Sequence, residues 1–395
     1  MTFFNHHILF AHLTPTFSIH INNKLTSFLL LGLLWSFPFL HRLHTYSFSG
    51  RYELPEVKGE KALDYAPGSP ERATLKAALA KVRSEVVEVP CYVNGERRFT
   101  GNVVNQVIPS DHGHVIARVH MAGDKDVDDA IAASAAARRS WASLEPHHRA
   151  IVFRKAADLM AGKHRAATMA ATMLGIGKSV WQAEIDASVE QIDFLRLAGN
   201  FAERIYAEQP HLHAANTWNR MRYRELEGFV AAISPFNFTA IGANLVAAPC
   251  VMGNVALWKP APSAALGNWR TLEVLEEAGL PAGVINFLPS TPAVFQRGLA
   301  HPTLAGLHFT GSTRTFSNLW KFIGDNVQTY RSYPRIVGET GGKNFHAVHP
   351  SADVGNAVLQ TVRSAFEYQV RAQRATRKAQ EKMTTKTCTL FEWDV

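Results

Sequence analysis

The sequence has few cysteines, and it lacks two motifs that commonly indicate a zinc site or a dinucleotide-binding site. Its 395 residues include three cysteines, Cys91, Cys250 and Cys388, which lie far apart without any Cys-x-x-Cys pair. This spacing excludes a disulfide scaffold and a thiolate zinc site, and it fits a reducing compartment. A complete Gly-x-Gly-x-x-Gly motif is also missing. With 47% apolar and 19% charged residues, the chain is nevertheless expected to form globular domains with real cores.

Metal-ligand clusters are missing from the sequence as well. The 18 histidines include two His-x-His pairs, at His112 and His114 and at His211 and His213. Both pairs are expected in loops, without carboxylate or cysteine partners in register. We therefore predict no metal site.

The chain is basic, but its charge is not gathered into a surface for nucleic acid. Of the net charge of +8, residues 1–50 carry +2 and residues 369–395 carry +3, so 33 bases face 30 acids in between. No basic stripe with interleaved aromatic residues is present, and such a stripe is typical of nucleic-acid binding. We therefore expect no nucleic-acid partner.

The first 52 residues contain no Asp or Glu. Their apolar run, Ser27 to Leu40, is shorter than the about 20 residues that span a bilayer, and Pro38 interrupts it, so a membrane partner is not expected. An acid-free segment is typical of organelle transit peptides, although those are usually richer in Arg. Three interpretations stay open: a mitochondrial presequence, an uncleaved anchor, and residues wrongly joined to the chain.

The first half of the chain has the pattern of helices with one early hairpin. Asn94-Gly95 separates two short strand-like runs, which is typical of a tight hairpin turn. Asp124 is expected to cap an Ala-rich helix that runs to about Trp141. The other elements predicted here are helices near 149–161, 163–174 and 181–209 and an exposed or edge strand over 219–225.

The second half alternates short buried-strand runs with helices of 10 to 16 residues. This alternation predicts a parallel, doubly wound α/β sheet with right-handed crossovers, in which ligands bind beyond the carboxyl ends of the strands. The predicted strands cover residues 229–233, 255–258, 284–288, 304–309 and 335–338.

Two of these strands end in polar side chains suited to chemistry. Asn237 follows the first strand in a turn stiffened by Pro235. Its carboxamide N–H can stabilise an oxyanion, and the alternative is an Asn turn or cap. Lys259 ends the second strand just before Pro260. Its ammonium suits ribose hydroxyls or phosphate, and the alternative is a solvated lysine.

Two further strand ends carry glycines and oxygen atoms. Gly311 and Ser312 stand where a strand passes into a helix, so free backbone N–H groups and the helix dipole can attract a pyrophosphate. Glu339 precedes Gly341 and Gly342, which let a ligand approach the backbone closely. A carboxylate in that place is a candidate general base.

Together the four junctions resemble the aldehyde dehydrogenase superfamily, whose members oxidise aldehydes with NAD or NADP through a cysteine thioester. Phe316 replaces the closing glycine of the general motif, as in the 1-pyrroline-5-carboxylate dehydrogenase branch. The resemblance covers roughly Glu53 to Tyr368. The runs that are similar to this branch are Glu227–Ile241, Trp258–Pro260, Glu277–Pro281, Phe309–Ser312 and Arg363–Tyr368.

The resemblance implies a fold, a reaction and a location. The fold would be a Rossmann-like doubly wound parallel sheet, aldehyde dehydrogenase-like, with most of the catalytic domain missing. The reaction would be NAD-dependent oxidation of a small aldehyde, L-glutamate γ-semialdehyde, to L-glutamate in proline degradation. The family is homo-oligomeric and typically lies in the mitochondrial matrix, but its C-terminal oligomerisation strand is missing here.

The resemblance also implies residue roles. Asn237 would hold the oxyanion of the thiohemiacetal, and Glu339 would activate water against the thioester. Glu190, on the long predicted helix, resembles a position facing the substrate's ammonium end, and a solvated helix carboxylate is the alternative. The residues that would line the dinucleotide are Ile233, Ser234, Pro235, Phe236, Lys259, Gly311 and Ser312.

Two departures from the family pattern weaken this site. Pro262 stands where the family usually has an acidic or polar residue, so a ribose contact is expected to be missing. Gln373 stands at the position of the nucleophilic cysteine. Cys250 is expected to be a buried apolar thiol, and Cys388 belongs to a tail without family features. The chain as written is therefore expected to be inactive.

The sequence thus predicts five segments and leaves two functions open. One function is the family's oxidation reaction, and the other is that of a non-catalytic NAD-binding pseudoenzyme or a fragment from a faulty gene model. The sequence also leaves open whether the cofactor is NAD or NADP. The segments are a transit or spurious segment (1–52), a helical part with an oligomerisation strand (53–226), a dinucleotide-binding domain (227–338), the start of a catalytic domain (339–368) and a tail (369–395).

Overall fold

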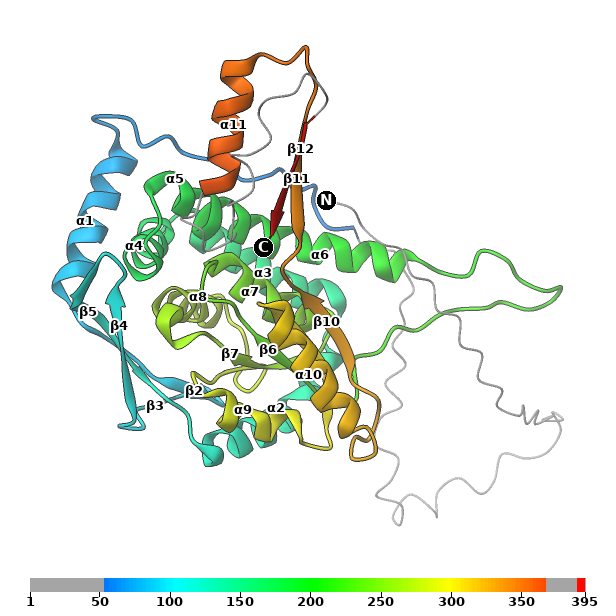
Figure 1. Ribbon diagram of the computed structural model, residues 1–395. Helices are drawn as coiled ribbons and strands as arrows, with labels where there is room; N and C mark the ends of the chain where they lie inside the picture. Colours follow the sequence, from blue (N-terminus) through cyan, green and yellow to red (C-terminus); the bar gives the residue numbers. More distant parts are fainter. Residues whose placement is uncertain (1–52, 367–388, 395) are drawn as a thin grey trace, which may run out of the picture. The chain divides into compact units, whose positions relative to one another are not determined.

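The computed structural model describes residues 53–366 and 389–394 (Figure 1). These residues belong to one compact unit, and the segment boundaries predicted within it stay predictions. The interpretations of residues 1–52 and the positions of Gln373 and Cys388 lie outside the described residues. None of the helices in the described ranges is long and apolar enough to cross a membrane.

A seven-stranded sheet, in the order β10-β9-β6-β7-β8-β2-β3, lies at the centre of the second half. The neighbours from β10 to β8 are all parallel, which confirms the predicted doubly wound α/β sheet. Their bounds are β6 Phe229–Ile233, β7 Val255–Lys259, β8 Ile285–Phe287, β9 Leu304–Thr310 and β10 Arg335–Glu339.

The hairpin of β2 (Cys91–Val93) and β3 (Glu96–Arg98) extends this sheet at one edge. Asn94 and Gly95 have positive φ angles of 53° and 84°, as the predicted tight turn requires. Tyr92 of β2 pairs antiparallel with Phe287 of β8. A segment from the first half of the chain therefore completes the sheet of the second half.

Helices cover both faces of the parallel strands (Figure 1). On one face α2 packs across β6, β7 and β8 and against α9, and on the other α7 contacts β6, β7 and β9 and packs against α8. Both faces of the central strands are therefore buried. The helices are α2 Asp124–Ser143, α7 Thr239–Val251, α8 Ala265–Glu277, preceded by the short η2 Pro262–Ala264, α9 Pro292–Leu299 and α10 Thr313–Asp325.

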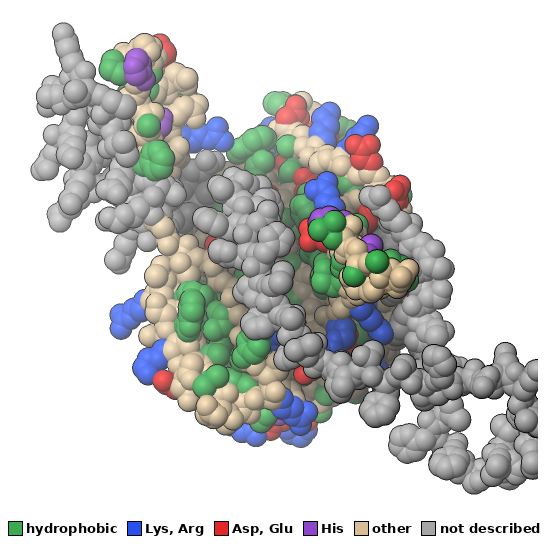
Figure 2. All heavy atoms as spheres, turned by 90° about the vertical axis from the view of Figure 1, so that its right-hand side faces the viewer, with side chains coloured by type: hydrophobic (Ala, Val, Ile, Leu, Met, Phe, Trp, Pro, Cys, Tyr) green, Lys and Arg blue, Asp and Glu red, His purple; other side chains and the backbone are tan. Residues whose placement is uncertain are grey.

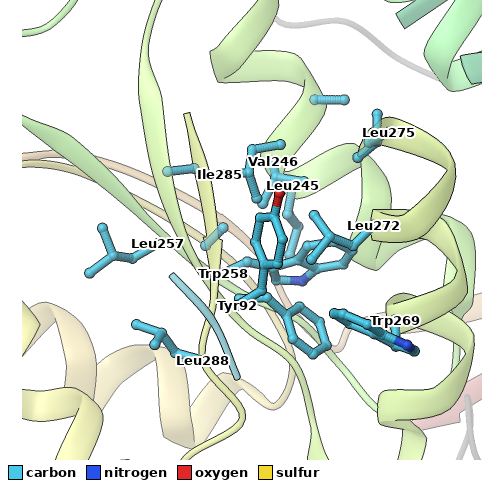
Figure 3. Packing of buried hydrophobic residues seen from close by; sticks show 14 of the residues in the cluster. Tyr92, Leu245, Val246, Leu257, Trp258, Trp269, Leu272, Leu275, Ile285 and Leu288 are labelled. Carbon is cyan, nitrogen blue, oxygen red and sulfur yellow. The ribbon is translucent and has the colours of Figure 1, made fainter. Parts of the chain in front are cut away.

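Aromatic side chains fill the core between the sheet and α8. Trp258 meets Phe287 edge to face at 5.1 Å between ring centroids, and Trp269 lies 5.9 Å from Phe287. Figure 3 shows Tyr92, Trp258 and Trp269 gathered with Leu272 in this layer. Burial of such large rings supplies much of the apolar area that stabilises a domain.

The first half of the chain is mainly helical, as predicted, with a small sheet in the order β1-β5-β4 that the sequence patterns did not indicate. His112 and His114 lie on β5, so their predicted place in a loop is wrong. The elements are α1 Pro70–Ser84, β1 Val87–Val89, β4 Val103–Ile108, β5 Asp111–His120, α3 Pro146–Ala161 and α4 Arg165–Ile176.

The cap of α2 differs from the prediction by one residue. Gly123 is the N-cap, and its N–H donates to the Asp126 carboxylate at 2.9 Å. Asp124 is instead the first residue of the helix. An acid in the first turn still stabilises the helix through its dipole.

The long helix predicted over 181–209 is interrupted. It consists of α5 (Val180–Ala183), a π-helical segment η1 (Glu184–Glu190) and α6 (Gln191–Ala207). A π segment widens the turn and is frequent at functional sites. Here Glu184, Asp186 and Ser188 are all fully buried, so the segment directs polar side chains into the protein.

Residues 208–228 form a long loop between α6 and β6 (Figure 1). The edge strand predicted over 219–225 is therefore wrong, because no strand is assigned in this loop. The loop exposes Leu212 and Trp218, which are 79% and 76% accessible. In Figure 2, viewed from the side toward which the loop extends, hydrophobic and histidine side chains stand at the surface.

After β10 the chain forms β11 (Lys343–Val348) and α11 (Val354–Phe366). β11 pairs antiparallel with β12 (Thr389–Asp394). This strand pair forms a two-stranded sheet separate from the central one.

Candidate active site

The carboxyl ends of four adjacent parallel strands bring the predicted site residues to one edge of the central sheet. Ile233 pairs with Lys259 on one side and with Phe309 on the other. Glu339 pairs with Thr310, the residue before Gly311. The strand ends are thus in register, and the side chains that follow them share one edge.

The turn between β6 and α7 is tied to the end of β7. The N–H of Ser234 donates to the carbonyl of Lys259 at 3.0 Å. The indole N–H of Trp258 donates to Ser234 Oγ at 2.6 Å, so the hydroxyl of this buried serine already has a structural partner. The next residues, Pro235 and Asn237, are half-buried, and Phe236 is 49% exposed.

Two buried charged residues, Asp186 and Lys178, contact the other end of this turn, where α7 begins. Asp186 of η1 accepts hydrogen bonds from the backbone N–H groups of Thr239 at 3.0 Å and Ala240 at 2.8 Å, at the start of α7. Lys178 donates to the same carboxylate at 2.6 Å. The ammonium of Lys178 also lies 3.6 Å from the centre of the Phe238 ring.

Lys259 is the last residue of β7, as predicted, and is half-buried. Burial lowers the pKa of its ammonium. Within the described ranges no carboxylate forms an ion pair with it. Lys259 therefore lies at the sheet edge, as predicted, and its contact with ribose or phosphate stays a prediction.

The junction between β9 and α10 has little room. A Cβ atom on Gly311 would come within 2.6 Å of the Phe309 ring, so a larger residue does not fit without a shift. The N–H of Gly311 donates to the carbonyl of Glu339 at 3.1 Å, which joins this junction to β10. Ser312 caps α10 and accepts from the N–H of Thr315 at 3.3 Å.

Glu339 ends β10, and its side chain is exposed. Phe316 of α10 packs beside it: a Cβ atom on Gly338 would lie 2.2 Å from the Phe316 ring. Phe316 also stacks on Phe309 with 5.8 Å between centroids and 19° between planes. The phenyl ring thus fills the space above the strand end that carries Glu339.

Glu190 is the last residue of η1 and is half-buried. Burial, with the nearby negative charges of Asp186 and Glu339, raises its pKa to about 7, while Lys178 acts in the opposite direction. The negative charge of Glu339 therefore contributes to the raised pKa of Glu190. The role of Glu190 toward the substrate stays a prediction.

The thiols of the described residues are not placed for chemistry. Cys250, on α7, is fully buried, and burial raises its pKa, which confirms the expectation of a buried thiol. Cys91 is also buried, and its pKa is raised to about 12, mainly by burial. No group of three His, Cys, Asp or Glu residues suited to a metal occurs in the part of the chain that the structure describes.

The structure therefore gathers Asn237, Lys259, Gly311 and Glu339 at one edge and brings Glu190 toward them from η1. Sequence patterns missed Lys178, which lies in the connection between α4 and α5, and Asp186, which lies on η1. Their contacts with α7 depend on how the two halves pack. A local pattern carries no signal for such a contact.

Comparisons with known proteins agree with this fold. A profile described as the aldehyde dehydrogenase family matches residues 97–376. A delta-1-pyrroline-5-carboxylate dehydrogenase of Agaricus bisporus is 50% identical over 319 residues, covering 80% of this chain and 58% of that protein. A mitochondrial protein of the same name from Emericella nidulans is 52% identical over 322 residues, covering 80% of this chain and 56% of that protein.

A solved structure shows the same similarity in three dimensions. The delta-pyrroline-5-carboxylate dehydrogenase of Mycobacterium tuberculosis, bound with NAD, superimposes with a TM-score of 0.79 at 45% identity, covering 82% of this chain and 61% of that one. The chain belongs to the aldehyde dehydrogenase family. It spans a little under three fifths of the length of the two curated relatives described above, 58% and 56%.

Proposed function

We propose that this chain carries the dinucleotide-binding part of an enzyme that oxidises L-glutamate γ-semialdehyde, formed from 1-pyrroline-5-carboxylate, to L-glutamate in proline degradation. The observation that carries this proposal is the register of the four strand ends, which brings Asn237, Lys259, Gly311 and Glu339 to one edge. The names of the relatives supply the substrate.

Asn237 and Glu339 are the proposed catalytic residues. The carboxamide N–H of Asn237 would donate to the oxyanion that forms when a thiolate adds to the aldehyde carbon. Glu339, exposed at the strand end, would take a proton from the water that attacks the resulting thioester. Glu190, half-buried near Glu339, would pair with the ammonium group of the substrate.

The residues at the sheet edge fit NAD. The N-terminus of α10, capped by Ser312, favours an anion. The half-buried ammonium of Lys259 suits ribose hydroxyls, and Ile233 and Ser234 lie next to this lysine. Pro235, Phe236 and Ser312 are the other residues proposed to line the dinucleotide. When bound, NAD supplies the hydride acceptor. Pro262 begins η2 and offers no side-chain hydrogen bond to a ribose.

We propose the mitochondrial matrix as the location and a second copy of the chain as the partner. The mitochondrial name of the Emericella nidulans relative supports the location. The long loop 208–228 with its exposed Leu212 and Trp218 supports self-association. Sedimentation velocity would test this, because Trp218→Ser should then shift the protein toward the monomer.

Turnover tests the catalytic part of the proposal. Because Gln373 replaces the family nucleophile, the chain as written should not reduce NAD when the aldehyde is added. Turnover that disappears with Cys388→Ser would contradict this expectation.

A repaired chain tests the roles. Residues 369–395 are replaced by the continuation of a relative, which includes Gln373→Cys. This chain should reduce NAD with the semialdehyde, and Asn237→Ala should lower kcat by about 10² to 10³ while NAD still binds. Glu339→Gln should slow release of glutamate from the thioester. If neither substitution changes the rate, the proposed roles are wrong.

The pseudoenzyme alternative rests on the intact sheet edge, which survives without the thiol. Calorimetry on the chain as written should then give a dissociation constant for NAD on the order of 10⁻⁴ to 10⁻³ M. A folded sample that binds no NAD at millimolar concentration would exclude this alternative and favour a non-functional fragment.

A further inference from the structure

The turn that carries Asn237 leads directly into α7, and the start of this helix has no cap of its own. The first N–H groups of a helix lack intrahelical partners and are usually satisfied by a Ser, Thr, Asp or Asn side chain at the N-cap. Here the N-cap is Phe238, which has no side-chain acceptor. Asp186 of η1 takes that place and binds the N–H groups of Thr239 and Ala240.

Asp186 is fully buried, and its charge is balanced by Lys178, which is 7% exposed. A buried carboxylate needs such a partner, because removing one charge of a buried pair leaves the other uncompensated. Lys178 also lies against the Phe238 ring, a favourable cation–π contact. The ion pair therefore binds the backbone of Thr239 and Ala240 through Asp186 and contacts the side chain of Phe238 through Lys178.

Two further helices bind the same residue, Thr239. The hydroxyl of Thr239 lies 2.9 Å from that of Thr172 on α4. The carbonyl of Thr239 accepts from the carboxamide of Asn268 on α8 at 3.2 Å. The first residue of α7 is thus fixed by η1, α4 and α8, which leaves little freedom for the residues immediately before it.

The π segment links this anchor to Glu190. Asp186 and Glu190 both lie on η1, and the charges of Asp186 and Lys178 both act on the Glu190 carboxyl. One ion pair therefore acts on the Asn237 turn through hydrogen bonds and on Glu190 through its charges.

We propose that Asp186 and Lys178 are positioning residues that hold the Asn237 turn in its catalytic conformation. The inference rests on the proposed function for the role of Asn237. Its structural part, an anchor at the start of α7 supplied by η1, does not need that function.

Hydrogen exchange on the chain as written tests the anchor. Asp186→Asn keeps the size of the side chain but removes its charge. The amides of Thr239 and Ala240 should then exchange about tenfold faster or more, since hydrogen bonds to a charged acceptor are among the strong ones. Lys178→Met should have the same effect, and Lys178→Arg should restore most of the protection.

Glu184→Gln is the matched control. Glu184 is as buried as Asp186 and lies on the same π segment, but it accepts from Tyr65 and the N–H of Leu63. It should lower the melting temperature without selectively exposing the amides of Thr239 and Ala240. If Asp186→Asn exposes them no more than Glu184→Gln does, the proposal is overturned. Should Asp186→Asn not fold, the double variant Lys178→Met/Asp186→Asn removes both charges and takes its place.

A double-mutant cycle in the repaired chain tests the link to Asn237. If Asp186 acts through that side chain, Asp186→Asn should lower kcat more than it changes KM, and it should cost little further rate once Asn237→Ala is present. Independent, multiplicative losses would overturn the positioning role. A repaired chain without activity would count against the proposed function, whereas the exchange experiment would still decide the anchor.

Discussion

The two sides of the candidate site are packed very differently. On the β6 and β7 side, every strand residue except the last is buried. On the β10 side, all strand residues except Ile336 are exposed. The cause is position: β6 and β7 have strands on both sides and helices on both faces, whereas β10 is an edge strand that hydrogen-bonds to β9.

This difference decides how each half of the site can be studied. Asn237 and Lys259 stand on the buried side, where a substitution can disturb folding as well as chemistry. Glu339 stands on the exposed edge strand, on which Val337 is 56% accessible. Substitutions there should report on function with little change in stability.

The largest expected effect is on the buried side. Trp258→Ala removes a fully buried ring and the hydrogen bond to Ser234, and it should destabilise the fold by about 3–5 kcal/mol. Val337→Ala, on the edge strand, should stay within about 0.5 kcal/mol. Urea unfolding of both variants measures the difference. Equal losses would show that the two sides are not distinct.

The same contrast explains what could be predicted from the sequence. The strand over 229–233 was predicted with its observed bounds, because a buried parallel strand is a continuous apolar run between turn signals. β4 and β5 were missed because polar residues such as Gln106 interrupt their pattern. The carboxamide of the buried Gln106 accepts from the N–H of Leu266 on α8 and donates to the carbonyl of Gly175 on α4, and both partners are distant in sequence.

The site was predicted unevenly for a similar reason. The strand-end residues follow from local patterns, since parallel strands bring their carboxyl ends to one edge. The π segment does not, because its register depends on the partners of its buried acids. Glu184 meets Arg165 of α4 and Tyr65, and Asp186 meets α7.

A smaller effect is expected for cofactor binding. Lys259→Ala removes the half-buried ammonium at the sheet edge and should weaken NAD binding about tenfold, or roughly 1.4 kcal/mol. His112→Ala, on β5, is the control and should leave the affinity unchanged. Calorimetry measures both, and an unchanged affinity in the lysine variant would remove Lys259 from the cofactor site.

A dependence of stability on pH is also expected at Glu190. Its pKa in the folded chain is about 7, above the ordinary value of 4.5, because of burial and the charges of Asp186 and Glu339 opposed by Lys178. The protonated carboxyl therefore favours the fold, and this contribution is full below the ordinary value and lost as the pH rises through about 7.

Glu190→Gln imitates the protonated form. The variant should melt a few degrees higher than the parent at about pH 8 and nearly together with it at about pH 4. Glu339→Gln, at the exposed edge, should change the melting temperature less at either pH. If the difference in melting temperature between Glu190→Gln and the parent is the same at every pH, the pKa of the Glu190 carboxyl is not raised.

The contact between Gly338 and Phe316 couples two positions on different elements. A Cβ atom at position 338 would lie 2.2 Å from the Phe316 ring, so a methyl group there requires the ring to move. A shorter residue at position 316 would remove this contact, and alanine at position 338 should then be tolerated better. Substitutions at the two positions should therefore not be independent, because the side chain on α10 affects which residues β10 accepts.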